Sequence, residues 1–137
     1  MKELKFRAII LERNAIFYFT PKDLIQDKFS NREILWKWLE EGNQPDLFIG
    51  AKDKNGREIY EGDIVLIDGG DSFLGIKQQY VVRYDSINAS YCFETNNGDK
   101  IYLTNFGNPD FFIKNKVEVI GNIYENPELI VLLSNDA

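Results

Sequence analysis

The side chains in this sequence that could do chemistry are mainly carboxylates. Four of them, Asp53, Glu58, Glu61 and Asp63, lie within one short stretch of the chain. Paired carboxylates at a controlled separation can flank a glycosidic bond or share a divalent cation. The residues after Asp53 do not complete a calcium-binding EF-hand loop with its distal glutamate. The pattern therefore favours acids that shape turns on a solvated rim over acids that convert a substrate.

Other catalytic side chains are scarce. The 137-residue sequence contains no histidine, the commonest general base near neutral pH and the commonest metal ligand. The single cysteine, Cys92, excludes an internal disulfide and a thiolate cluster, and its apolar surroundings are typical of an inert thiol. We expect no catalytic residue, no metal and no cofactor. A hydrolase that uses Asp53, Glu61 and Asp63, with or without a metal ion, is the alternative.

The charge balance of the chain is acidic. The 22 acidic and 16 basic side chains give a net charge of −6, which argues against nucleic acid as a partner because phosphate binding needs a clustered positive surface. An acidic decoy of a host nucleic-acid-binding protein is a further alternative. No run approaches the roughly twenty apolar residues of a membrane-spanning helix. We therefore expect a cytoplasmic protein that is not membrane-bound.

The acids must be positioned by the stretch of residues 48–67. Asn55-Gly56 lies between two apolar segments and predicts a tight hairpin turn of type I′, in which both central residues have positive φ. In the following turn, Gly62 supplies a backbone angle closed to other residues, and the Asp63 carboxylate accepts backbone N–H bonds. The aliphatic run after Asp63 then predicts a buried strand.

A helix is expected between Ser30 and Glu41. Ser30 and Glu33 form a capping box, apolar residues recur at four-residue spacing, and Gly42 follows as a stop signal. Trp36 falls away from the apolar stripe of this helix. It is therefore either exposed, as a candidate anchor for a partner protein, or buried beneath the neighbouring loop.

The remaining pattern is that of short strands separated by glycine turns. It predicts a mainly β (β-rich α+β) fold, with a small, strongly curved antiparallel sheet or partly open barrel that is in part Src-homology-three-like. We expect a single domain over residues 1–137, with a helical insertion at 20–46 that carries one helix near 30–41. The β-barrel-like core is expected at 47–129.

Three segments of the chain resemble the YopX family of phage and prophage proteins. The central segment runs from Lys52 through Asn55-Gly56 to Val65, the opening strand is at residues 5–8, and the closing motif is at 119–129. The motif residues are Asp53, Gly56, Ile59, Tyr60, Glu61, Gly62, Asp63, Gly121, Asn122 and Tyr124.

The resemblance implies a β-rich domain, an origin in a temperate phage or an integrated prophage, and no assigned biochemical activity. It implies no catalytic residue for this chain. We therefore expect a non-enzymatic accessory protein that works through contacts with a host or phage protein. Exposed strand edges invite self-pairing, so we also expect a homo-oligomer.

Overall fold

The structure is a computed structural model, and the fold is mainly β, as the sequence predicts. The chain divides into two compact units, Met1–Phe48 and Ile49–Ala137. The expected insertion at residues 20–46 lies in the first unit, and the assignment of the whole chain to a single domain stays a prediction. The structure describes residues 4–26, 31–68, 77–95, 97–103 and 109–129.

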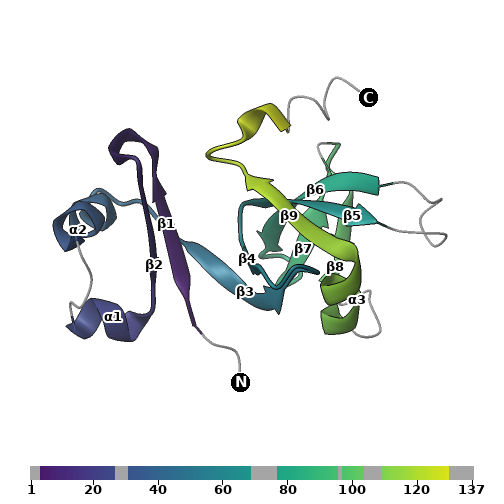
Figure 1. The fold of residues 1–137 in the computed structure, drawn as a ribbon, viewed down its shortest axis with the longest axis horizontal. Coiled ribbons are helices and arrows are strands. Elements are labelled where there is room, and N and C mark those ends of the chain that lie inside the picture. Colours follow the sequence, from purple (N-terminus) through teal and green to yellow (C-terminus); the bar gives the residue numbers. More distant parts are fainter. Residues whose placement is uncertain (1–3, 27–30, 69–76, 96, 104–108, 130–137) are drawn as a thin grey trace. The chain divides into compact units, whose positions relative to one another are not determined.

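The first unit is a small sheet with two helices (Figure 1). Its strand β1 pairs antiparallel with both β2 and β3. Ala8, Phe19 and Leu35 form its buried core, and the rings of Phe6 and Phe19 stack with their centroids 5.5 Å apart. Its elements are β1 (Phe6–Ile10), the 3-10 helix η1 (Leu11–Arg13), β2 (Ala15–Phe19), α1 (Pro21–Gln26), α2 (Arg32–Glu40) and the first residues of β3 (Asp46–Lys52).

Helix α2 lies where the sequence predicts a helix, but its cap differs. The N-cap is Asn31, which has a left-handed φ of 59° and makes no side-chain cap bond, while Ser30 lies outside the described residues. At the other end, the N–H of Gly42 donates to the carbonyl of Leu39 at 3.0 Å, and its φ of +92° ends the helix as expected.

The structure contains two α-helices that the sequence analysis does not predict. Before α1, Thr20 and Asp23 form a reciprocal capping box, with N–H···O distances of 2.9 and 3.2 Å, and Pro21 occupies the first helical position. Pro21 therefore begins a helix as well as ending strand pairing. Helix α3 (Pro109–Lys116) also starts at a proline, and it buries Ile113 at 1 % exposure.

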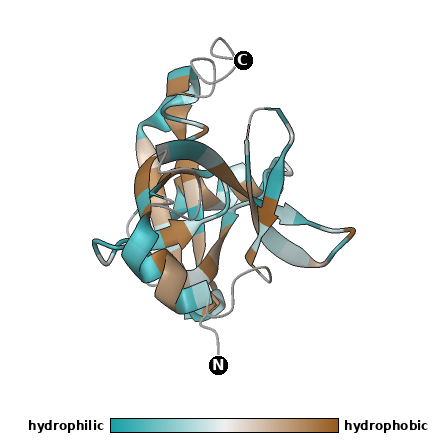
Figure 2. Ribbon diagram, turned by 90° about the vertical axis from the view of Figure 1, so that its right-hand side faces the viewer, coloured by the Kyte–Doolittle hydropathy of each residue, from teal (hydrophilic) through white to brown (hydrophobic). Residues whose placement is uncertain are grey.

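The second unit is a curled antiparallel sheet with the strand order β8-β7-β6-β5-β9. The ribbon carries both hydrophobic (brown) and hydrophilic (teal) segments (Figure 2). Ile59, Val65, Val82, Phe93 and Val117 are all fully buried in its core. Besides the end of β3 and α3, its elements are β4 (Glu58–Tyr60), β5 (Asp63–Asp68), β6 (Lys77–Asp85), β7 (Ser90–Glu94), β8 (Lys100–Tyr102) and β9 (Val117–Asn122).

The hairpin between β3 and β4 forms, but its turn is not of type I′. Only Gly56 has a positive φ, of 82°, and Asn55 does not. The Gly56 N–H donates to the Asp53 carbonyl at 3.0 Å, and the Asp53 N–H donates to the Arg57 carbonyl at 2.8 Å. These bonds enclose a three-residue loop that ends in a left-handed glycine. The Asp53 carboxylate selects this turn because it binds the N–H groups of Asn55 and Arg57.

Strand β1 is buried more completely than an alternating pattern predicts. Arg7 lies on the face opposite Ala8, yet it is only 4 % exposed. Its Nε and Nη2 atoms donate to Oδ2 of Asp46 at 3.2 and 2.9 Å, and Asp46 is 8 % exposed. A buried guanidinium is tolerated only with a paired acceptor, so this ion pair ties β1 to the start of β3.

We predict that Asp46→Ala will lower the free energy of unfolding by about 3 kcal/mol, because it leaves the buried charge of Arg7 without its carboxylate. Urea denaturation monitored by circular dichroism measures the loss. The control is Glu40→Ala, which removes an exposed acid of α2 and should change stability by less than about 0.5 kcal/mol. Equal losses in the two variants would contradict a structural role for the ion pair.

Candidate functional site

The residues of the family motif come together in the second unit, where β5 pairs with β9. The two strands are antiparallel, with Asp63 opposite Asn122 and Ile64 opposite Gly121. The register shifts between Ile64 and Val65, so β9 carries a bulge next to the motif. The pairing therefore places the turn before β5 beside the residues that follow β9.

Asp53 joins the hairpin to the outer edge of β9. The residue is 2 % exposed, and its Oδ1 atom accepts the N–H groups of Asn55 and Arg57 at 2.9 and 2.8 Å. Its Oδ2 atom accepts the N–H of Val119 at 2.9 Å, and the N–H of Lys54 donates to the carbonyl of Val117 at 2.9 Å. The carboxylate is thus a buried backbone cap that closes part of a sheet edge.

Asp63 and Gly62 form the second turn. Asp63 is 1 % exposed, and its Oδ2 atom accepts the N–H of Tyr60 at 2.8 Å. Gly62 has a φ of +85°, its N–H donates to the carbonyl of Val82 at 2.8 Å, and its carbonyl accepts the N–H of Ile123 at 2.9 Å. The left-handed angle is the reason that this turn carries a glycine. The turn links β6 to the segment after β9.

The side chain of Asn122 caps the turn that follows β9. Its Oδ1 atom accepts the N–H groups of Tyr124 and Glu125 at 3.1 and 2.8 Å, and its Nδ2 atom donates to Glu125 at 2.8 Å. The backbone N–H of Asn122 donates to Oδ1 of Asn126 at 3.1 Å. The Asn126 side chain fills the space where a Cβ atom of Gly121 would lie, so a larger residue there would displace Asn126 from its bond with Asn122.

The other motif residues fall into two groups. Ile59 and Tyr60 are buried, at 0 % and 1 % exposure, and the Tyr60 hydroxyl donates to Oε1 of Glu58 at 3.1 Å. Glu61 and Tyr124 instead lie toward the surface, and Tyr124 is 36 % exposed. Most of the motif therefore builds backbone and core.

Glu61 lies near enough to Tyr91 for its charge to act on that hydroxyl, and we call Glu61, Tyr84, Tyr91 and Tyr124 the tyrosine surface. Tyr84 is 48 % exposed, and its ring meets the ring of Tyr91 edge-on at a centroid distance of 5.2 Å. Burial, followed by the charges of Glu61 and Tyr84, raises the pKa of Tyr91 to about 12. A Cβ atom on Gly62 would lie 3.4 Å from Cε2 of Tyr124, so this ring rests on the turn beside Glu61.

Sequence reasoning missed a second polar cluster, at the turn between β6 and β7. The Tyr102 hydroxyl donates to Oδ2 of Asp85 at 2.6 Å, and the Asn88 amide donates to both Asp85 and Tyr102. Lys100 lies 3.5 Å from Asp85. The Tyr102 hydrogen bond, supported by those of Asn88 and Ile87, holds the pKa of Asp85 well below its ordinary value. The Asp-x-x-Asn turn can be recognised in the sequence. The contact with Tyr102 cannot, because this residue comes from another strand.

Two other candidates lie apart from the motif. Trp36 is 38 % exposed, so it sits at the surface of α2, and its role as a partner anchor stays a prediction. Cys92 is 1 % exposed, and burial raises the pKa of its thiol, which therefore stays protonated near neutral pH.

No three acidic or cysteine side chains among the described residues gather as ligands for a metal ion. No helix in this part of the chain is long and apolar enough to cross a membrane.

We predict that Asp53→Asn will lower the free energy of unfolding by about 3 kcal/mol. The amide has one oxygen in place of two, so an NH₂ group must face at least one of the buried N–H donors of Asn55, Arg57 and Val119. Urea denaturation measures the change. Asp99→Asn makes the same chemical change at an exposed position, and a loss there as large as in Asp53→Asn would count against the cap.

We predict a pH signature for the Tyr102–Asp85 bond. The folded-state pKa of Asp85 is lowered, so the bond stabilises the protein above the ordinary carboxyl pKa of about 4 and is lost as the pH falls through the folded value. The difference in melting temperature between wild type and Tyr102→Phe should therefore be constant above about pH 5 and shrink below about pH 4. Tyr84→Phe, on an exposed ring, should show no such trend.

Comparisons with known proteins place the chain in a family. The YopX protein family matches residues 5–131. The crystal structure of protein EF1440 from Enterococcus faecalis has a similar fold, with a TM-score of 0.53 and 20 % sequence identity over 95 % of this chain and 99 % of that one. No curated protein gives a significant match. Because this match covers nearly the whole chain, the protein belongs to the YopX family.

Proposed function

We propose that the protein is a non-catalytic protein-binding module, which a phage or prophage encodes and which acts in the cytoplasm of a bacterial host. The main support for this proposal is that two acids of the motif are buried and bind the backbone. Asp53 and Asp63 are 2 % and 1 % exposed, and both hold backbone N–H groups. Carboxylates occupied in this way are withheld from a substrate, so the motif builds a scaffold for the surface around it.

The tyrosine surface is the best candidate for the contact with a partner. Tyrosine is enriched in protein interfaces because its ring covers a large area with few rotatable bonds and its hydroxyl can still form hydrogen bonds. Glu61 adds a carboxylate among the rings, and the chain as a whole carries a net charge of −6. These features favour a partner that presents arginine or lysine, which can pair with Glu61 and lie over a ring.

Self-association is the second part of the proposal. Strand β2 is one of the end strands in the two sheets, so its outer edge offers backbone groups to another strand. Ile16 and Tyr18 of β2 are 45 % and 58 % exposed. An exposed edge with apolar side chains supports pairing with a second copy of the chain.

We predict that the double variant Tyr84→Ala/Tyr124→Ala will recover at least about tenfold less of its partner than wild type. The loss follows from removing two aromatic anchors, each worth more than about 1 kcal/mol in an interface. The measurement is affinity capture from host cells during phage induction, quantified by mass spectrometry.

The control is Tyr18→Ala, which removes an even more exposed tyrosine, at 58 %, from the first unit. It should leave the capture unchanged but weaken self-association, measured by sedimentation velocity at micromolar concentration. Capture that is equal for wild type and the double variant would refute the tyrosine surface. A wild-type protein that sediments as a strict monomer would remove self-association.

A further inference from the structure

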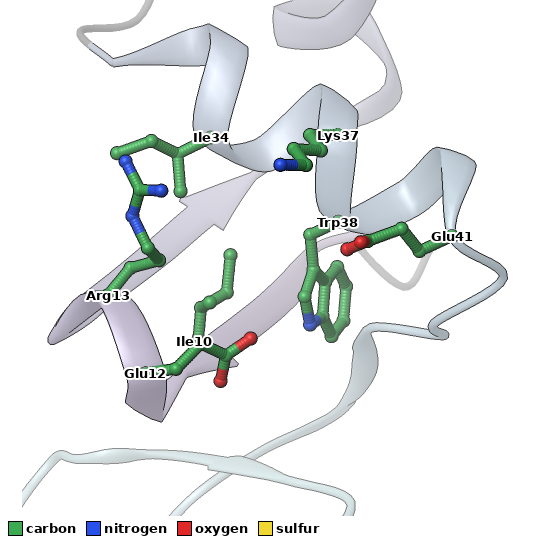
Figure 3. Close-up of a pocket in the computed structure, with 7 residues that line it drawn as sticks. All are labelled: Ile10, Glu12, Arg13, Ile34, Lys37, Trp38 and Glu41. Atoms are coloured by element: carbon green, nitrogen blue, oxygen red, sulfur yellow. The ribbon is translucent and has the colours of Figure 1, made fainter.

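The first unit contains a hollow that neither the motif nor the tyrosine surface uses (Figure 3). Its volume is about 150 Å³, and it lies between the end of β1, η1 and α2. Its walls are Ile10, Ile34 and Trp38. Its rim carries four charged side chains, from Glu12, Arg13, Lys37 and Glu41.

The size of the hollow limits what can enter. Pockets for small-molecule ligands usually measure about 300–1,000 Å³, whereas an apolar cavity of about 150 Å³ is large enough for benzene. One branched or aromatic side chain therefore fits, and the rest of its molecule stays outside. This arrangement is that of an anchor pocket in a protein interface.

The charged residues on the rim determine which residues can flank the inserted side chain. Figure 3 shows Arg13 beside Ile34 on one side of the hollow, and Glu41 beside Trp38 on the other. Glu12, Arg13, Lys37 and Glu41 form no ion pair or side-chain hydrogen bond with other described residues. Both signs of charge are thus available at opposite sides of one apolar hollow.

We propose that this hollow binds a segment of a partner protein that inserts one aromatic or branched apolar side chain between Ile10, Ile34 and Trp38. An acidic residue on one side of the inserted side chain pairs with Arg13, and a basic residue on its other side pairs with Glu41. Because exposed ion pairs contribute little by themselves, the apolar side chain supplies most of the affinity and the charges set its direction. The site is independent of the tyrosine surface, so either can fail without the other.

The experiment uses the two tryptophans as reporters, since Trp38 lines the hollow and Trp36 does not. The full chain is labelled with fluorotryptophan and titrated with the capped peptide Glu-Phe-Lys, while the fluorine signals of both residues are followed. We expect the Trp38 signal to shift and the Trp36 signal to stay. The peptide Glu-Ala-Lys, which lacks the anchor, should bind at least about tenfold more weakly.

Charge variants on exposed residues test the rim without disturbing the fold. The double variant Arg13→Gln/Glu41→Gln, which removes both rim charges, should bind the neutral peptide Gln-Phe-Gln as wild type does, and should lose the dependence on salt that wild type shows with Glu-Phe-Lys. The matched control is Glu40→Lys, which changes the charge of the neighbouring residue outside the hollow and should leave peptide binding unchanged.

Three results would overturn the proposal. The first is an unmoved Trp38 signal at millimolar Glu-Phe-Lys, and the second is a shift of equal size with Glu-Ala-Lys. The third is a shift of Trp38 that grows with the concentration of the protein alone and is suppressed by Glu-Phe-Lys, which would make a second copy of the chain the occupant.

Discussion

The second unit depends on one buried carboxylate. Asp53 satisfies two N–H groups of its own turn and one N–H of β9, while Lys54 occupies the neighbouring carbonyl of that strand. An outer strand of a sheet exposes unpaired backbone groups, and burying them unpaired would be costly. One aspartate therefore shapes the hairpin and covers the edge, and it explains why the hairpin has a three-residue loop. Each hydrogen bond given for that carboxylate runs to a backbone N–H group, so its place in the structure is that of a cap.

The sequence predicts this fold where the signals are local. Gly42 ends α2, the Asn-Gly pair makes a hairpin, and the aliphatic run after Asp63 is a buried strand. Helices α1 and α3 are not predicted, although both begin at a proline and proline suits the first position of a helix. Thr20-Pro21-Lys22-Asp23 carries a capping box that would have revealed α1.

The candidate surfaces are harder to predict than the elements because they depend on register. Tyr84 faces Tyr91 only because β6 and β7 pair at those positions, and Asp85 meets Tyr102 only once β8 has joined the sheet. The hollow of the first unit requires α2 to lie over the end of β1, which no spacing within either element specifies. Local patterns show that Asp53 and Asp63 suit turns; they give no indication of what packs beside Glu61.

The bond between Asp53 and Val119 spans 66 residues of sequence, and this separation has a kinetic consequence. A hairpin such as β3–β4 closes within microseconds, whereas contacts between distant segments wait until the intervening chain is ordered. We therefore expect β9 to dock late, after the nucleus of the sheet has formed. Late contacts govern the rate of unfolding more than the rate of folding. Loss of the bond from Asp53 to β9 should therefore speed unfolding more than it slows folding.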